Sequence, residues 1–326
     1  MPIVVNSNSS ATQASMNLSR ANDSLRKSLA RLSSGKRINS PADDAGGLAV
    51  AYKLNSKLNR SQAVVQNAQN SLSYLQVQDS GLQSVGKILD RMGELRTMAQ
   101  DITKNSQDIE NYSKEFVELQ SQLNQIKQEK FNGISLFSAQ SSTVEGTLIQ
   151  DTTETVKTAG GVDVNYEKYG RTLITHPSGI DTMGSISINV VNLQFVLSIG
   201  TLANNTAATD IDLGGLDTGT AGANGINASG FIADILDVNV SQFTEAIERL
   251  ADMRAENGAE QNRVMNTLDL LQTNITNLEA AHGRIMDADI ALESTRFARH
   301  NVLVQASAAM TAQANQLTNV ALQLLG

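Results

Sequence analysis

The sequence has no cysteine, no tryptophan, three prolines, and only five tyrosines and seven phenylalanines in 326 residues. Without cysteine the chain forms no disulfide, no thiolate metal site and no cysteine nucleophile. So few aromatic side chains argue against the thick core and lined pocket of a compact enzyme. Because proline costs a helix interior about 3 kcal/mol, the long stretches without it permit long helices.

Charge and hydropathy argue against two kinds of partner. The 25 Lys and Arg residues against 33 Asp and Glu give a net charge of -8, which disfavours nucleic-acid binding as the main function. No run of 18 apolar residues occurs, so we expect no membrane insertion. Residues 1–10 lack a basic segment followed by an apolar one, so we expect no classical signal peptide. By these ordinary rules the chain would be cytoplasmic.

Both ends of the chain carry small or apolar residues at helical spacing. One stripe recurs every three or four residues from 11 to 32, and a longer one with heptad spacing runs from 54 to 102. A third stripe runs from 109 to 126 and ends before the turn signal at 131–133. The second helix is predicted to start near residue 41, because Ser40 suits an N-cap and Pro41 suits the first helical position.

The far end repeats this pattern and the middle does not. Apolar residues at helical spacing run from 247 to 285 and again from 302 to 324. Residues 138–231 instead alternate apolar and polar residues at 186–190, 193–199 and 211–213, which predicts β-hairpins. The predicted fold is therefore mainly α: long antiparallel coiled-coil helices from both termini form a rod, and a small β-rich insertion occupies the middle.

No residue pattern predicts an active site, a metal site or a cofactor site. Helical geometry would scatter His282, Asp287 and Asp289 around the axis, and we interpret His176 and His300 as a turn residue and an exposed helix residue. Adjacent acids do not face one site, so Asp43 and Asp44 are interpreted as charges near a helix N-terminus. The basic cluster lacks interleaved aromatic residues and favours subunit contacts or a solvated face; it comprises Arg26, Lys27, Arg31, Lys36 and Arg37.

The terminal stripes are too narrow to bury themselves, so the terminal helices need partners, either each other or other copies. Copies that pack head to tail without closing a ring form a helical filament. We predict a self-assembly seam at Leu18, Leu25, Leu32, Val302, Ala306, Ala309, Val320 and Leu324.

Two long motifs resemble those of bacterial flagellin. Residues 32–50, LSSGKRINSPADDAGGLAV, are similar to the N-terminal signature of that family. Residues 287–293, DADIALE, with 312–316, AQANQ, and the final Leu-Leu-Gly resemble its other end. The likeness covers about residues 1–137 and 232–326.

This resemblance implies a subunit that polymerises into a flagellar filament for swimming motility and is not an enzyme. The implied division is an inner coiled-coil domain from 1–44 and 286–326, rod-domain helices from 45–137 and 232–285, a rod-domain hairpin and loop from 191–231, and an outer variable insertion from 138–190. A hook–filament junction protein, which resembles flagellin at both ends, is the alternative.

The resemblance also implies partners and a location. A flagellin passes unfolded through a flagellar export apparatus, with an export chaperone, and joins junction and cap proteins in an extracellular filament. In many flagellins an innate immune receptor reads an arginine and a leucine on one helix and a glutamate on the next. Those positions match Arg91, Leu95 and Glu118, whereas Asp90 and Gly93 depart from the family pattern. The alternative is that Leu95 belongs to the core seam while Arg91 and Glu118 serve subunit packing.

Overall fold

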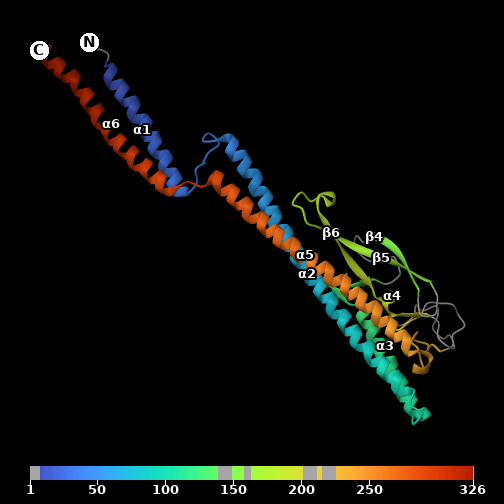
Figure 1. The fold of residues 1–326 in the computed structure, drawn as a ribbon. Coiled ribbons are helices and arrows are strands. Elements are labelled where there is room, and N and C mark those ends of the chain that lie inside the picture. The colour runs from blue at the N-terminus through green and yellow to red at the C-terminus, as the bar shows by residue number, and fades with distance from the viewer. Residues whose placement is uncertain (1–7, 139–148, 158–162, 201–210, 215–224, 326) are drawn as a thin grey trace. The chain divides into compact units, whose positions relative to one another are not determined.

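A computed structural model describes residues 8–138, 149–157, 163–200, 211–214 and 225–325. Six helices lie in these ranges (Figure 1), with bounds α1 Ser9–Ser34, α2 Ala45–Ala99, α3 Ser106–Lys127, α4 Leu193–Leu197, α5 Val240–Met286 and α6 Ile290–Leu325. The strands are β1 Lys130–Phe131, β2 Ile134–Ser135, β3 Phe137–Ser138, β4 Ile149–Lys157, β5 Asp163–Ile174, β6 Ser185–Asn192, β7 Ser198–Gly200 and β8 Ile211–Asp212. The mainly helical fold with a small β-rich middle is confirmed.

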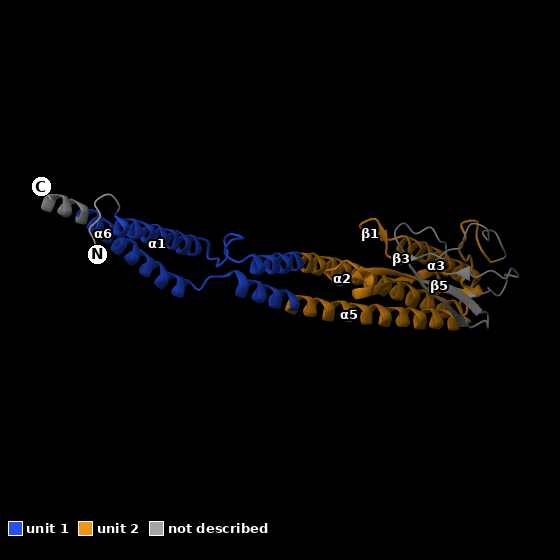
Figure 2. Ribbon diagram, turned by 90° about the horizontal axis from the view of Figure 1, so that it is seen from above, with its two compact units in different colours: residues 1–59, 274–326 blue, residues 60–273 orange. Residues whose placement is uncertain are grey.

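The chain divides into two compact units, coloured separately in Figure 2. Unit 1 comprises residues 1–59 and 274–326, and unit 2 comprises residues 60–273. Helices α2 and α5 each contribute residues to both units. None of the described helices is long and apolar enough to cross a membrane.

In unit 1, α1 and α6 lie side by side and run antiparallel. Near the start of α1, the Asn8 amide donates to the carbonyl of Ala314 at 2.8 Å. Near its end, the Ala288 N–H donates to the carbonyl of Gly35 at 2.9 Å. Gly35 ends α1 with a φ of 68°, a left-handed conformation that glycine adopts without steric cost.

The second helix begins later than predicted. Residues 41–43 form a turn, and α2 starts at Ala45. The Asp44 carboxylate accepts a hydrogen bond from the Gly47 N–H at 2.8 Å, so Asp44 is the N-cap in place of Ser40. The prediction was wrong by one turn because it gave the cap to a serine when an aspartate four residues later also suits that position.

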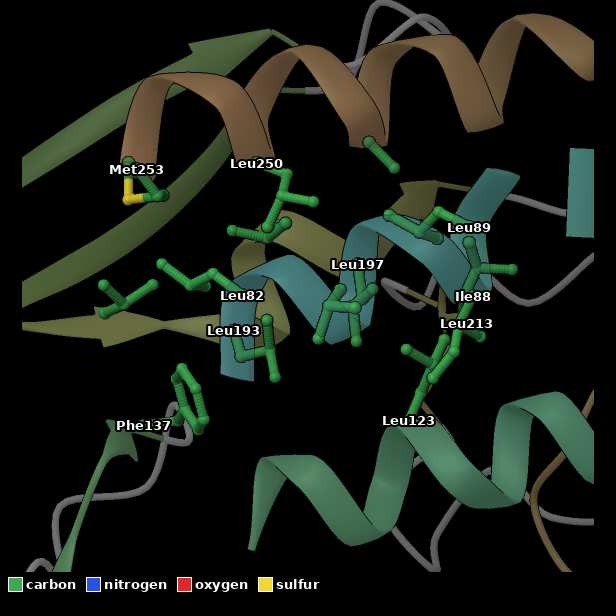
Figure 3. Close-up of a cluster of buried hydrophobic side chains, with 14 of the residues drawn as sticks. Leu82, Ile88, Leu89, Leu123, Phe137, Leu193, Leu197, Leu213, Leu250 and Met253 are labelled. Atoms are coloured by element: carbon green, nitrogen blue, oxygen red, sulfur yellow. The ribbon is translucent and has the colours of Figure 1, made fainter. Parts of the chain in front are cut away.

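Unit 2 has one hydrophobic core built from α2, α3, α5 and the strands (Figure 3). The core side chains of the three helices come mainly from the predicted stripes, and Leu82, Leu89 and Leu123 among them have no exposed surface. Ile102, which the heptad pattern had included, lies beyond the end of α2 and is fully exposed. The predicted third helix and its turn are confirmed, since α3 ends at Lys127 and Asn132 and Gly133 have positive φ.

The strands form one four-stranded sheet and two small hairpins. The sheet order is β3-β6-β5-β4, in which β5 pairs antiparallel with both β4 and β6, and β3 pairs parallel with β6. The β1–β2 and β7–β8 pairs are antiparallel. The sheet also contacts α5, because the two Glu260 oxygens accept from the Asn189 N–H at 2.9 and 3.1 Å and Glu256 accepts from its amide at 2.9 Å.

The segment 193–199 is not one strand, although its alternation predicted this. Residues Leu193–Leu197 form the short helix α4, which Asn192 caps by accepting from the Phe195 N–H at 3.2 Å. Val196, which alternation would expose, is fully buried beside its neighbours. The Arg249 guanidinium closes the other end by donating to the Phe195 carbonyl at 3.0 Å and to the Ser198 hydroxyl at 2.8 Å. Tertiary contacts thus override the local pattern.

Candidate self-assembly surface

The α1 side of the terminal helix pair carries the predicted seam residues on the face toward α6. Leu18, Leu25 and Leu32 are all half-buried, at the spacing of a single helical stripe. Ser28 is the only residue of α1 that is fully buried. The pairing therefore covers the leucines only partly.

On α6, the residues that face α1 differ from the predicted ones. Buried or half-buried positions recur at helical spacing, at Glu293, Phe297, His300, Val304 and Ser307. The predicted seam contained none of the five. Three of them are polar and the search selected apolar residues, while Phe297 and Val304 are apolar but do not share the helix face of the stripe that starts at Val302. Their three-and-four spacing was the available signal.

Three of the predicted α6 residues lie on other faces of that helix. Val302 is 64% exposed, and Ala306 and Ala309 are exposed as well. The side chains of Val320 and Leu324 lie outside the described part of the structure. The structure therefore leaves Val302, Ala306 and Ala309 uncovered by α1.

Residues 35–44, which join α1 to α2, are hydrogen-bonded to residues 283–289, where α5 ends and α6 begins. We call these two segments together the clasp. The Arg37 N–H donates to the Met286 carbonyl at 2.6 Å, and its guanidinium donates twice to the Ile285 carbonyl, at 3.1 and 2.9 Å. Beneath these bonds, Ile38 and Met286 are buried together with Ala51 in a small separate core. Residues about 250 positions apart in sequence are thus fixed in register, as the bridge between Lys36 and Asp287 also shows.

The two adjacent acids of the clasp have structural roles. The Asp43 carboxylate accepts hydrogen bonds from the backbone N–H groups of Asn39 and Ser40, at 3.3 and 3.2 Å, and these bonds hold its pKa below the usual range. Asp44 caps α2 and lies 3.6 Å from the Arg37 guanidinium. Neither geometry forms an acid–base pair aimed at a common point.

Asp289 is likewise a cap. It accepts from the Leu292 N–H at 3.1 Å at the start of α6. Within the described ranges, no group of three or more His, Asp or Glu side chains is placed to hold a metal ion.

The candidate receptor residues lie in unit 2 and are only partly brought together. Arg91 donates to Glu115 at 2.8 Å and to Glu94 at 3.1 Å, and these hydrogen bonds raise its pKa further above its usual value. Glu118 is exposed but is not the glutamate that Arg91 contacts, and Leu95 is fully buried. Sequence reasoning missed Glu115, which stands one helical turn before Glu118 on α3.

Comparisons with known proteins match both ends of the chain. The family model described as the bacterial flagellin N-terminal helical region matches residues 5–142, and the C-terminal helical region matches residues 240–325. The chain is 30% identical over 327 residues to the flagellar filament 33 kDa core protein of Treponema phagedenis, covering 99% of this chain and 100% of that protein. It is also 30% identical over 325 residues to a flagellin of Bacillus subtilis, covering 98% and 99% of the two chains.

The chain belongs to the bacterial flagellin family. It is accordingly a structural subunit of the flagellar filament, which serves motility, and not an enzyme. The matches do not favour the alternative of a hook–filament junction protein. For a flagellin, the uncovered faces of α1 and α6 are surfaces on which copies can pack.

The lowered pKa of Asp43 predicts an acid-sensitive clasp. A carboxylate whose pKa is lower in the folded state contributes stability above its unfolded pKa of about 3.9 and loses it as the pH falls through the folded value. We therefore expect Asp43→Asn filaments to dissociate at a lower temperature than wild type at neutral pH, and to lose less further stability in acid. Circular dichroism melting of filaments from about pH 7 to pH 3 measures both effects.

The matched control is Asp23→Asn, because Asp23 is an exposed acid of α1 outside the clasp. If both variants show the wild-type pH profile, the Asp43 hydrogen bonds do not contribute to filament stability.

Proposed function

We propose that this flagellin assembles by folding its terminal helices and packing them against other copies. The observation that carries the proposal is the partial burial of α1, where Leu18, Leu25 and Leu32 stay half-buried and Ser28 alone is fully buried. Apolar area left in water gives a driving force of about 25 cal/mol per Å² for contact with a neighbouring copy. Two long helices that bury so few side chains have marginal stability in a single copy, and they gain stability by mass action when copies assemble.

A polar residue at the centre of the seam should weaken assembly. Leu25→Asn removes an apolar side chain from the α1–α6 contact and places an amide there, which costs about 2 kcal/mol or more per copy. We expect the concentration needed for polymerisation to rise at least about tenfold, since 1.4 kcal/mol corresponds to a factor of ten. Sedimentation of polymer, with electron microscopy of the pellet, measures it.

The conservative control is Leu25→Met, which keeps an apolar side chain of similar volume and should polymerise like wild type. Unfolding of unit 2 in urea should be the same in all three chains, because Leu25 lies in unit 1. Normal filaments from Leu25→Asn chains would contradict the proposal.

We further propose that the chain leaves the cell unfolded through the flagellar export apparatus, aided by an export chaperone, and is added outside the cell between junction and cap proteins. The absence of cysteine and the presence of only three prolines suit this route, because neither disulfides nor slow prolyl isomerisation would delay folding at the tip. The inner coiled coil, rod and outer insertion predicted from the sequence are the domains proposed for the filament subunit.

The proposed export route predicts how the chain is divided between sheared filaments and the cell interior. It should be the main protein of filaments sheared from cells, and inactivation of the export apparatus should leave it inside. Quantitative mass spectrometry of both fractions measures this. A trace amount in sheared filaments would favour a junction protein instead.

An innate immune receptor is a proposed partner at Arg91, Leu95 and Glu118. Support comes from the exposure of Glu118 and the partial exposure of Arg91, whose side chain is 43% exposed. Leu95 is buried in the free chain and can act there only by shaping the surface. A groove of about 510 Å³ lies beside Arg91, between α2 and the start of α5 near Phe243.

Arg91→Ala should therefore abolish signalling in receptor-bearing reporter cells, because it removes the one exposed cation of the patch. Arg263→Ala is the control: it removes an exposed arginine of α5 that does not line the groove beside Arg91. Equal signalling by Arg91→Ala and wild-type monomers would leave packing as the role of the patch.

A further inference from the structure

One flank of the α1–α6 pair carries a groove lined by small and neutral side chains. The groove measures about 530 Å³ and lies toward the free end of the pair, between Ser10, Gln13, Ala14 and Asn17 of α1 and Ala306 and Met310 of α6. Because its lining carries no charge, an apolar side chain could enter it without burying an unpaired ion.

Helix geometry shows on which side of the α1–α6 pair the groove lies. Ser10, Gln13 and Asn17 each stand one position before a half-buried residue of α1 that faces α6. Ala306 and Met310 likewise each precede a half-buried residue of α6. Since one residue turns a helix by about 100°, and the two helices are antiparallel, all these positions lie on the same flank of the pair.

Two large apolar side chains project from the opposite flank at the other end. Leu29 follows the buried Ser28 and is 55% exposed. Ile290, the first residue of α6, is 61% exposed and is rotated by about 60° from the buried Glu293 toward the same side as Leu29. Both lie next to the clasp, whereas the groove lies toward the start of α1.

We propose that the Leu29–Ile290 pair of one copy inserts into the groove of the next copy. A groove and a projection on opposite flanks and at opposite ends cannot meet within one molecule, and they do not form a two-fold closed contact. Repeated docking of this kind instead produces an open, staggered row of copies. The axial offset between neighbours would be about 24 Å, the rise from Gln13 to Leu29 at 1.5 Å per residue.

The inference rests on the proposed assembly of α1 and α6 and adds which surfaces meet. The cysteine-free sequence allows a direct test, because any introduced cysteine is the only one in its chain. Filaments are grown from an equal mixture of Leu29→Cys and Ser10→Cys chains and treated with a short bis-maleimide cross-linker. Every covalent dimer on a denaturing gel then joins two copies.

The matched control replaces Ser10→Cys with Ser19→Cys. Ser19 is an exposed serine of the same helix, but it follows Leu18 and lies on the flank away from the groove. We expect several-fold more dimer from the Ser10→Cys mixture than from the Ser19→Cys mixture or from either variant alone. Ile290→Cys, mixed in the same way, provides the projecting cysteine if Leu29→Cys chains do not enter filaments.

Filaments in which both projecting variants cross-link to residue 10 no better than to residue 19 would overturn the inference and leave the proposed assembly standing. If the wild-type chain forms no filaments at all, the proposed function fails first.

Discussion

The structure depends on one constraint: two helices alone cannot bury their own apolar stripes. Ser28 is the only fully buried residue of α1, and the side chains described in α6, up to residue 316, include just two that are, Glu293 and Ala314. By contrast, the 22 residues of α3 include four buried side chains, with Phe116 and Leu123 among them. The difference is one of partners, since α3 packs in a core of several layers and α1 has α6 alone.

Unit 2 buries its hydrophobic core within a single copy. Several of its buried polar groups pair across elements: the Gln78 amide donates to the Leu136 carbonyl at 2.9 Å and accepts from Asn257 at 2.6 Å. Arg96, whose pKa burial lowers, donates to the carbonyl of Val238 ahead of α5. Such paired groups order a core without help from another chain. Unit 1 has in their place the clasp, which sets the register of α1 and α6 and leaves their outer faces free.

The spacing of apolar residues predicted much of this fold, because a long helix leaves a repeating pattern in its own local sequence. The stripes of α2, α3 and α5 hold for their buried residues, and Asn132-Gly133 marked its turn correctly. What failed depends on distant contacts. Residues 193–197 became helical because Arg249 caps them and Val196 is buried, and the parallel pairing of β3 with β6 joins segments more than 50 residues apart.

The pairing of α1 with α6 was predicted in part. The α1 leucines face α6 as a stripe should, but polar residues such as Glu293 and His300 occupy the facing positions of α6. A search for apolar residues could not find them. The clasp also escaped prediction, because the Arg37 bonds go to the carbonyl of Ile285, which any residue would supply. Arg91 shows the same limit, since the choice of Glu115 over Glu118 depends on how α3 packs against α2.

We propose that burial of the terminal helices is completed between copies. Hydrogen exchange of backbone amides in monomers and in filaments tests it most directly. We expect α1 and α6 to exchange rapidly in the monomer and slowly in the filament, while the α2, α3 and α5 amides of unit 2 are protected in both states. Full protection of α1 and α6 in the monomer, unchanged on polymerisation, would contradict it.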